Sequence, residues 1–483
     1  MDFERLERLL KKNNQNHVLS DLKDDESREY LLNLFETLNI DEFCESVKHT
    51  LNRPTSEKLN CSPPDPKIIS GEKHLNREET SELEEVGFNA IKDGKVGVLL
   101  LSGGQGTRLG SKHPKGLFKV GLPSEKSLLK LHVERMLQLM KLTEARFNSK
   151  ASIQWYIMTS EFTMEDIKEY LHSNSYFGFN KDDIYIFQQF TVPSVSFDGR
   201  FIMQTAARIA ESPEGNGGIY RALREQGIIE HMKLKGVEFI QVYCVDNIMV
   251  RLADPRFIGY CVKNDLDFSV KTVRKESPEE RLGVIGRVEK SYQVIEYSEI
   301  SEELSRAREN SGDQLLFNCG SICIFFYSLR FLQRVSNAEF DKHLLYHIAR
   351  KKIPYWDPVA EKTLEPKQPN GIKLEKFIFD VLPFSEKFGI WEVNREDEFS
   401  PLKNPAGSGS ECPETCRESV LKQGARFALA AGATLASDSV VEISPLVSLF
   451  GENLEFLKNT HLSGVNYVTL DKATGSPIIE HLK

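Results

Sequence analysis

Apolar runs alternate with helical patterns through the middle of the chain. The apolar runs are short and bounded by turn residues, as is typical of buried strands, and they lie at residues 96–101, 154–160, 184–187 and 239–245. Between them, apolar residues recur at helical spacing at residues 127–142, 164–173 and 219–234. Strands that alternate with helices favour a parallel sheet covered on both faces, so the pattern predicts an α/β fold.

The two ends of the chain depart from this alternation. Residues 1–50 show helical spacing, whereas residues 53–79 are polar and contain four prolines, which is typical of a linker or an irregular crossing. After about residue 265 the pattern changes to antiparallel alternation, as at residues 291–301. The segment from about residue 404 is first rich in Gly and Ser and then apolar. We therefore expect a helical N-terminal region (1–94), a central domain (95–400) and a small C-terminal, β-rich domain (401–483).

Charge and hydropathy exclude several classes of partner. The chain has 483 residues and a formal net charge of −9, which does not favour binding to nucleic acid or to an anionic membrane. The N-terminus is charged throughout, unlike a secretory signal. The longest apolar run near the C-terminus, residues 427–436, is too short to span a bilayer. These features predict a cytoplasmic protein without a membrane partner.

The eight cysteines are scattered along the chain. Cys412 and Cys416 form the only close pair in a polar setting, and no second pair at zinc-ligand spacing accompanies them. Reduced thiols in a reducing compartment are the favoured interpretation, and zinc or a disulfide at this pair is the alternative.

A glycine-rich loop follows the first apolar run of the middle region. Gly103, Gly104 and Gly106 precede two basic residues, Arg108 and Lys115. Glycines let backbone amides approach anionic oxygens, and the cations can grip a polyphosphate, so the loop predicts phosphate binding. Neither of the two common phosphate motifs fits: Gly116 follows Lys115 where a P-loop needs Ser or Thr, and the last glycine of a dinucleotide fingerprint would fall on Leu109. A purely structural glycine turn remains the alternative.

The loop LSGGQGTRLGSKHPKG (101–116) resembles the signature loop of the sugar nucleotidyltransferases, and its glutamine is typical of eukaryotic-type UDP-N-acetylhexosamine pyrophosphorylases. The resemblance continues in order along the chain, through residues 155–160, 187–189, 215–223, 242–247, 253–259, 283–288, 292–301, 315–320, 369–380, 395–404 and 441–448. It implies a central Rossmann-like nucleotidyltransferase domain with a mixed sheet, a helical N-terminal part and a small C-terminal domain.

The resemblance also implies a reaction. UTP and N-acetylglucosamine-1-phosphate would give UDP-N-acetylglucosamine and pyrophosphate by in-line attack at the α-phosphorus, with Mg²⁺ as cofactor. Such catalysis is mostly positioning and charge neutralisation. Another UDP-sugar, UDP-N-acetylgalactosamine or UDP-glucose, is the alternative product, and a non-catalytic UDP-sugar-binding homologue is a further alternative. We expect a monomer or a homodimer.

The resemblance assigns roles to individual residues. Arg108, Lys115 and Lys403 match the family's phosphate-contacting cations, and Asp246, at the end of an apolar run, matches its magnesium-binding aspartate. The remaining positions match nucleotide-binding and sugar-binding residues. The former are Leu101, Ser102, Gly103, Gly104, Gln189 and Gly215, and the latter are Asn216, Gly283, Glu296, Asn318, Phe377 and Phe379.

Four positions depart from the family's pattern. Ser102 stands where alanine is usual and Lys119 where aspartate is usual, while Cys319 and Ser321 replace the residues of the usual FNAGNI block. These departures bear on sugar preference rather than on the class of reaction.

Overall fold

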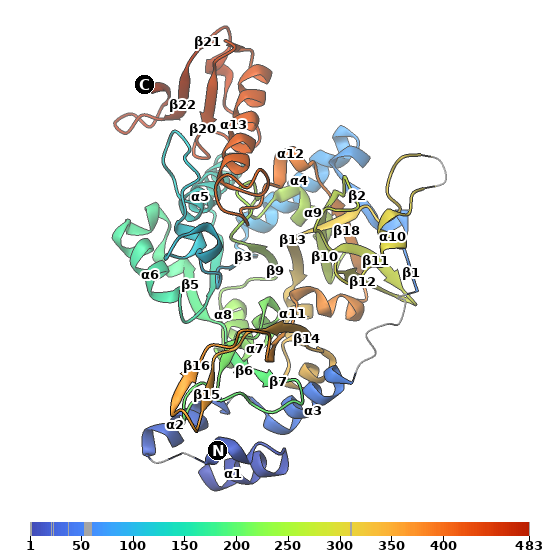
Figure 1. The fold of residues 1–483 in the computed structure, drawn as a ribbon. Coiled ribbons are helices and arrows are strands. Elements are labelled where there is room, and N and C mark those ends of the chain that lie inside the picture. Colours follow the sequence, from blue (N-terminus) through green and yellow to red (C-terminus); the bar gives the residue numbers. More distant parts are fainter. Residues whose placement is uncertain are drawn as a thin grey trace. The chain divides into compact units, whose positions relative to one another are not determined.

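The computed structural model describes residues 2–20, 22, 24–36, 38–52, 60–309 and 312–482. The chain divides into two compact units. The smaller unit is made of Met1–Asn60, Gln189–Ile229 and Leu332–Phe384, and the sheet unit of Cys61–Gln188, Glu230–Phe331 and Ser385–Lys483. Figure 1 follows the elements along the chain. The three-part division expected from the sequence stays a prediction.

One mixed sheet organises the sheet unit. Among the described residues it has eleven strands, and its main path runs β2-β18-β10-β13-β9-β3-β4-β5. These strands are β2 (Ile69–Gly71), β18 (Phe388–Glu392), β10 (Phe268–Arg274), β13 (Cys319–Ser328), β9 (Phe239–Cys244), β3 (Val96–Leu101), β4 (Gln154–Thr159) and β5 (Ile184–Gln188). Beside the path lie β1 (Cys61–Ser62), β11 (Val284–Val288) and β12 (Ser291–Ile295).

The direction of the strands changes across this sheet. The strands β9, β3, β4 and β5 are parallel to one another. By contrast, β13 is antiparallel to both of its neighbours, β9 and β10. The α/β fold with a mixed sheet is therefore confirmed.

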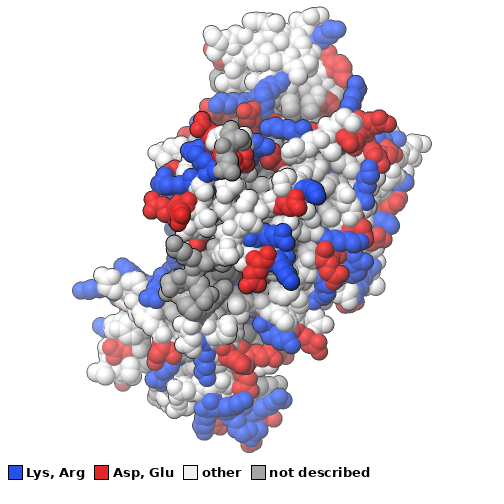
Figure 2. Space-filling model, turned by 90° about the vertical axis from the view of Figure 1, so that its right-hand side faces the viewer, with Lys and Arg blue, Asp and Glu red and all other residues white. Residues whose placement is uncertain are grey.

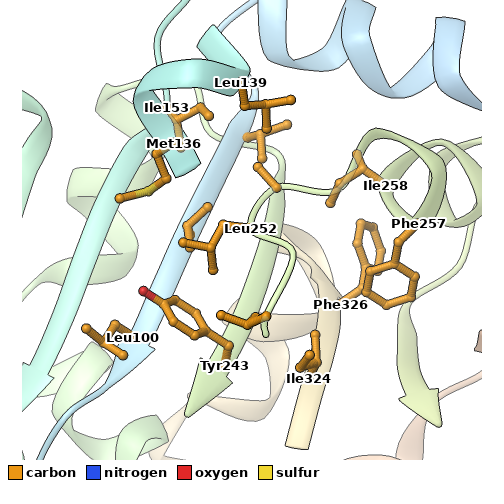
Figure 3. Packing of buried hydrophobic residues seen from close by; sticks show 14 of the residues in the cluster. Leu100, Met136, Leu139, Ile153, Tyr243, Leu252, Phe257, Ile258, Ile324 and Phe326 are labelled. Carbon is orange, nitrogen blue, oxygen red and sulfur yellow. The ribbon is translucent and has the colours of Figure 1, made fainter. Parts of the chain in front are cut away.

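Helices cover the buried strands. All six residues of β3 are buried, so both faces of this strand are covered. The helices wholly inside the unit are α4 (Arg77–Lys92), α5 (Leu128–Phe147), α6 (Met164–Ser173), α9 (Pro255–Lys263), α10 (Glu302–Arg306), α12 (Arg395–Glu398) and α13 (Pro413–Ala430), and parts of α8 (Ile228–Leu234) and α11 (Leu329–Val335) also belong to it. Figure 3 shows Met136 and Leu139 of α5 and Phe257 of α9 in one cluster with Leu100 of β3 and Tyr243 of β9. Burial of this apolar surface is the main favourable contribution to the stability of the unit.

The smaller unit begins with three helices, as the sequence predicts for residues 1–50. They are α1 (Phe3–Lys12), α2 (Asp25–Leu34) and α3 (Ile40–Leu51). Their apolar faces share one core with residues of the later segments, among them Phe201 and Tyr346. The strands of this unit are β6 (Thr191–Pro193), β7 (Val195–Ser196), β8 (Glu211–Pro213), β14 (His347–Lys351), β15 (Tyr355–Asp357), β16 (Lys362–Leu364) and β17 (Gly371–Glu375).

The helix expected at 127–142 is α5 and runs on to Phe147, and the predicted elements differ from the structure in three further places. The expected helix at 219–234 is two helices, α7 (Ile219–Glu225) and α8 (Ile228–Leu234), because Gly227 between them has a φ of +67°. The expected strand at 291–301 ends at Ile295. Of the predicted linker, residues 53–59 lie outside the described residues, and the rest contains β1 and β2 before α4 begins at Arg77.

The C-terminal segment forms small sheets of its own. Its strands are β19 (Thr434–Leu435), β20 (Val440–Ile443), β21 (His461–Leu462), β22 (Val465–Leu470) and β23 (Pro477–Leu482). It is fixed to the rest of the sheet unit by polar contacts: Glu442 accepts hydrogen bonds from the amide and hydroxyl of Ser124, and buried Lys126 donates to Ser444 and Glu134.

Two further features concern the outside of the molecule. On the face seen in Figure 2, cationic and anionic side chains are interspersed rather than gathered by sign. Within the part of the chain that the structure describes, no helix combines the length and the apolar character that crossing a membrane requires.

Candidate active site

The glycine-rich loop leaves the sheet at the carboxyl end of β3. It is anchored there because the Ser102 amide donates to the Met158 carbonyl at 2.8 Å. Packing requires glycine at position 106, since a Cβ there would lie 2.7 Å from the His113 carbonyl oxygen. Packing does not require glycine at position 104, which is exposed and has nothing within 4 Å of where its Cβ would be. The bare backbone at Gly104 therefore leaves open space that a ligand can enter.

Lys115 and Asp246 meet at this edge of the sheet. The loops that carry them follow β3 and β9, which are parallel neighbours with Leu101 opposite Cys244. Lys115 Nζ lies 3.7 Å from Asp246 Oδ2, and the two side chains are 18% and 22% exposed. Arg108, on the same loop as Lys115, is exposed. In open α/β sheets, ligands bind at this end of the strands.

Asn247 joins the turn that carries Asp246 to the segment that carries Lys403. Its Oδ1 accepts hydrogen bonds from the amides of Ser400 and Met249, and its Nδ2 donates to the Glu398 carbonyl at 2.7 Å. Two residues further on, the Leu402 amide donates to the carbonyl of Asp246 at 2.9 Å. Asn247 is 3% exposed, so losing these bonds would leave buried polar groups unpaired.

Lys403 follows directly and is held as a cation. Its Nζ lies 3.0 Å from Glu411 Oε1. Burial alone would lower the pKa of Lys403, but the carboxylates of Glu411 and Asp246 outweigh it and raise that pKa. The lysine is one-third exposed and remains reachable from solvent.

A single apolar cluster supports these charged residues. Leu109 follows Arg108, Ile248 lies two residues after Asp246, and Leu402 precedes Lys403. All three leucine and isoleucine side chains are buried in the same cluster, together with Val120, Leu122, Leu128, Leu131, Met249 and Cys416. Segments far apart in the sequence thus place their charged residues next to one small apolar core. The apolar residues of this core are called the rim cluster below.

Three of the sugar-binding candidates also lie together in the sheet unit. Gly283 precedes β11 and Glu296 follows β12, and a Cβ on Gly283 would lie 2.8 Å from Glu296 Oε1. The Gly283 carbonyl accepts from the Ser321 amide, and the Asn318 carbonyl accepts from the Lys275 amide, both at 2.8 Å. Hence Gly283, Glu296 and Asn318 belong to one corner of the sheet.

The other candidates lie in the smaller unit. Gly215 has a φ of +85°, and a Cβ there would lie 2.5 Å from the Lys376 carbonyl oxygen, so only glycine fits. Asn216 Oδ1 accepts from the Ile378 amide at 3.0 Å, which brings it beside Phe377 and Phe379, whose ring centroids are 5.1 Å apart.

Glu214 holds this group in place. It is 1% exposed, and Lys376 Nζ and the Tyr346 hydroxyl each lie 3.0 Å from its Oε1. Burial would raise the pKa of Glu214, but Lys376 and then Arg221 outweigh it and lower that pKa. Gln189, the candidate uracil contact, is buried and belongs to the same unit, where the carbonyl of the next residue, Phe190, accepts from the Glu214 amide.

The structure thus gathers the predicted residues into groups. Arg108, Asp246 and Lys403 each lie within two residues of a member of the rim cluster, and Lys115 is 3.7 Å from Asp246. Leu101, Ser102, Gly103 and Gly104 belong to the strand end and loop that lead to Arg108. Sequence reasoning missed Asn247 and Glu411. Asn247 stands next to Asp246 in the matched VYCVDN block, but its clamp on residues 398–400 depends on tertiary contacts.

The charged group suits a magnesium ion that is bound mainly by its substrate. Among the described residues, no three His, Cys, Asp or Glu side chains gather as a metal site. Mg²⁺ is commonly held by one or two carboxylates together with substrate phosphates and water. Asp246 offers one partly exposed carboxylate beside open backbone, which fits that mode of binding.

Comparisons with known proteins agree with this arrangement. The family model described as UTP–glucose-1-phosphate uridylyltransferase matches residues 40–461. The chain is 40% identical over 470 residues to UDP-N-acetylhexosamine pyrophosphorylase-like protein 1 of Xenopus tropicalis, covering 92% of this chain and 91% of the relative. It is 42% identical over 387 residues to the UDP-N-acetylglucosamine pyrophosphorylase of Saccharomyces cerevisiae, covering 79% of this chain and 80% of the relative.

A solved structure is similar over almost the whole length. It is the uridine diphosphate N-acetylglucosamine pyrophosphorylase from Trypanosoma brucei in complex with an inhibitor. The TM-score is 0.82 at 28% identity, and the match covers 96% of this chain and 98% of that chain.

Proposed function

The chain belongs to the UTP–glucose-1-phosphate uridylyltransferase family, and on that premise we propose that it makes UDP-N-acetylglucosamine and pyrophosphate from UTP and N-acetylglucosamine-1-phosphate. The observation that carries the proposal is the rim cluster, because it holds Arg108, Asp246 and Lys403 on one small core, with Lys115 3.7 Å from Asp246. The printed names of the relatives support the choice of sugar.

The side chains of this group suit phosphoryl chemistry. A sugar-phosphate oxygen attacks the α-phosphorus of UTP, and pyrophosphate leaves in line. Arg108 and Lys115 bind the nucleotide phosphates and the leaving group, and Lys403 approaches them from the C-terminal segment. Cations that are fixed before the reaction stabilise developing charge without reorganising, which is commonly the largest contribution to catalysis.

Asp246 is the proposed ligand of Mg²⁺. A bound magnesium ion would neutralise phosphate charge and help to orient the α-phosphate. The Asn247 clamp keeps the Asp246 turn against residues 398–402, so the carboxylate and Lys403 keep their positions.

We assign the remaining candidates to the two ends of the product. Gln189 offers an amide donor and acceptor to the uracil edge. The open backbone at Gly104 allows close approach, and Ser102, Gly103 and Gly215 are the other proposed nucleotide contacts. Asn216, Gly283, Glu296, Asn318, Phe377 and Phe379 are the proposed sugar contacts.

A pyrophosphate-release assay with UTP, Mg²⁺ and a panel of sugar-1-phosphates tests the proposal. We expect the highest kcat/KM for an N-acetylhexosamine-1-phosphate, because glucose-1-phosphate would leave groups that bind the acetamide unpaired, which can reject a substrate by orders of magnitude. Comparable values for glucose-1-phosphate would favour a UDP-glucose enzyme. Absence of pyrophosphate with every sugar would favour a non-catalytic UDP-sugar-binding protein.

The epimer N-acetylgalactosamine-1-phosphate belongs in the same panel, because one hydroxyl group separates it from the proposed substrate. A cytoplasmic location and a monomeric or homodimeric state remain our expectations, and light scattering of the purified chain measures the latter.

A further inference from the structure

Two cysteines meet beside the charged group described above. Cys244 is the last residue of β9, and Cys323 lies in the neighbouring antiparallel strand β13. The register pairs Tyr243 with Ile324, and the next residues along the two strands are Cys244 and Cys323. Residues that are directly opposed at such a pair have Cβ atoms about 4.5–5.5 Å apart, close to the spacing that a disulfide needs, so the two cysteines are near neighbours across the strands.

The backbone at Cys323 is irregular. Its φ is +55°, a left-handed value that is uncommon for a residue with a side chain. The register between β10 and β13 shifts at the same place, between Val270 and Thr272, as at a β-bulge. Bulges redirect side chains near functional sites, and this one lies at the residue that neighbours Cys244 across the two strands. Hydrogen bonding to Cys323, followed by burial, raises the pKa of Cys244, as expected of two thiols that lie close together.

The pair lies within electrostatic reach of the charged group. The charges of Asp246 and Lys115 affect the pKa of Cys244, and Cys323 contributes to the raised pKa of Lys403. Both cysteines are partly exposed residues, which leaves a route for a small oxidant to the pair. Cys412 and Cys416, the pair that is conspicuous in the sequence, are instead fully buried, and the Cys416 thiol donates to the Ser400 carbonyl.

We propose that Cys244 and Cys323 are a redox-sensitive dithiol, a modification site that hydrogen peroxide converts to a disulfide and that thereby lowers the activity of the neighbouring phosphate site. The loss of activity rests on the proposed function, whereas formation of the disulfide does not.

The chemistry needs one peroxide for each pair. The Cys323 sulfur attacks peroxide as the thiolate, because the raised pKa of Cys244 keeps that thiol protonated; an S–O bond forms, the O–O bond breaks, and water leaves with the proton that Cys323 gave up. The second thiol then attacks the sulfenic sulfur, forming the S–S bond and releasing a second water. The pair loses two electrons and two protons, and peroxide is reduced to two waters. A small dithiol such as dithiothreitol reverses the step by thiol–disulfide exchange.

Cross-linking affects the site because of where the pair lies. Cys244 is two residues before Asp246, and the two strands that the disulfide ties together are adjacent. A new covalent link there displaces the end of β9 and with it the Asp246 turn. Because a shift of about 1 Å in a reacting group can cost about 10²-fold in rate, we expect a loss of about tenfold or more.

The test uses the full chain, reduced and then freed of reductant. Samples are treated with hydrogen peroxide, divided, and assayed for pyrophosphate release before and after dithiothreitol. Cys323→Ser and Cys244→Ser are compared with Cys61→Ser, which changes another half-buried thiol, far along the chain in β1. Each variant is normalised to its own untreated activity, and the Cys244→Ala/Cys323→Ala double variant serves if a serine variant folds poorly. Mass spectrometry of unreduced tryptic peptides reports the link itself.

We expect the wild type and Cys61→Ser to lose activity reversibly and to yield a peptide that joins Cys244 to Cys323, while variants that lack either cysteine keep most of their activity. Equal inactivation of Cys323→Ser and the wild type, or inactivation without the joined peptide, would overturn the proposal. A joined peptide without loss of activity would overturn the effect on the site. A reduced protein that forms the link but never releases pyrophosphate would instead count against the proposed function.

Discussion

The sheet unit contains two charged clusters that treat their charges differently. Lys271 is fully buried and bonded to Asp254 and Glu398, which are also buried, and Arg251 lies 3.5 Å from Glu398. In the other cluster, Lys115 and Asp246 are partly exposed and 3.7 Å apart. The first cluster matches each charge with a close partner. The second, with Arg108 and Lys403, has more cations than Asp246 and Glu411 neutralise.

The difference separates charges that hold the fold from charges that are available to a ligand. Burial alone would lower the pKa of Lys271, but Asp254 and Glu398 outweigh it and raise that pKa, so the lysine stays charged inside the protein. The surplus of cations at the exposed cluster suits an anionic ligand such as a polyphosphate. Glu398 links the two, because its side chain belongs to the buried cluster while its carbonyl accepts from Asn247.

The largest expected effect concerns the buried cluster. Lys271→Ala leaves Asp254 and Glu398 buried without their lysine, and breaking such a pair costs about 3–5 kcal/mol of unfolding free energy. Denaturant unfolding measures the loss. The matched control is Lys263→Ala, whose ion pair with Glu82 is exposed and should contribute at most about 1 kcal/mol. Equal losses in both variants would show that the buried cluster is not structural.

The exposed cluster should behave in the opposite way. Arg108→Ala and Lys115→Ala should each lower turnover by about 10²-fold, as expected when one preorganised charge contact is lost. Their unfolding curves should match the wild type, because both residues lie on a loop with exposed or partly exposed side chains. Lys112→Ala, an exposed lysine of the same loop, is the control. Near-normal turnover in well-folded Lys115→Ala would show that Lys115 does not bind the phosphates as assigned.

The proposed binding of Mg²⁺ by Asp246 gives a third test of the exposed cluster. In Asp246→Asn the Mg²⁺ concentration for half-maximal turnover should rise about tenfold or more, since changes around a metal typically cost 10–100-fold in affinity. A magnesium titration of pyrophosphate release measures it, with Asp166→Asn, an exposed aspartate near His113, as the control. Full wild-type activity in excess EDTA would contradict the assignment.

A pH-dependent effect concerns a buried histidine in α5. His132 of α5 is fully buried, and burial, followed by Arg135, holds its pKa well below the ordinary value of 6.5. Below pH 6.5 the unfolded chain binds a proton at His132 that the folded chain does not bind. The contribution of His132 to the unfolding free energy is therefore fully present above pH 6.5. It is lost as the pH falls from 6.5 toward the lowered pKa, by about 1.4 kcal/mol per pH unit.

Unfolding at a series of pH values between 7.5 and 5, chosen around the ordinary histidine pKa of about 6.5, measures this slope. His132→Phe removes the titrating group, so its stability should fall less over the same range. Parallel profiles for the variant and the wild type would show that other groups cause the acid sensitivity.

Local pattern predicted the strands at the middle of the sheet well, because these strands are buried on both faces and bounded by turns. The strand at 96–101 and the helix at 164–173 have the bounds that the sequence indicates. The place of Asp246 followed as well, since it ends an apolar run. The antiparallel position of β13 between two strands with which it has no sequence continuity could not be predicted from periodicity.

The features that could not be predicted from the sequence depend on the position of β13 between β9 and β10 and on contacts between distant segments. The Cys244–Cys323 pair exists because β13 lies against β9 and bulges there, while the pair at Cys412 and Cys416 attracted notice through spacing alone. The Asn247 clamp and the rim cluster likewise join residues that are far apart along the chain. The roles of the site residues themselves remain predictions, which the variants above test.

The strand order has a consequence for how the protein is made. The early strand β2 pairs with β18, and β18 pairs with β10, so β2 finds its partner only after the chain has been synthesised to about residue 392. Pairings between such distant segments form slowly and leave edges unpaired in the meantime. On the ribosome, β3, β4 and β5 emerge early, and the segment that carries Lys403 follows the loops that carry Arg108, Lys115 and Asp246. The four residues proposed for the phosphate site therefore come together only after the chain has been synthesised beyond residue 403.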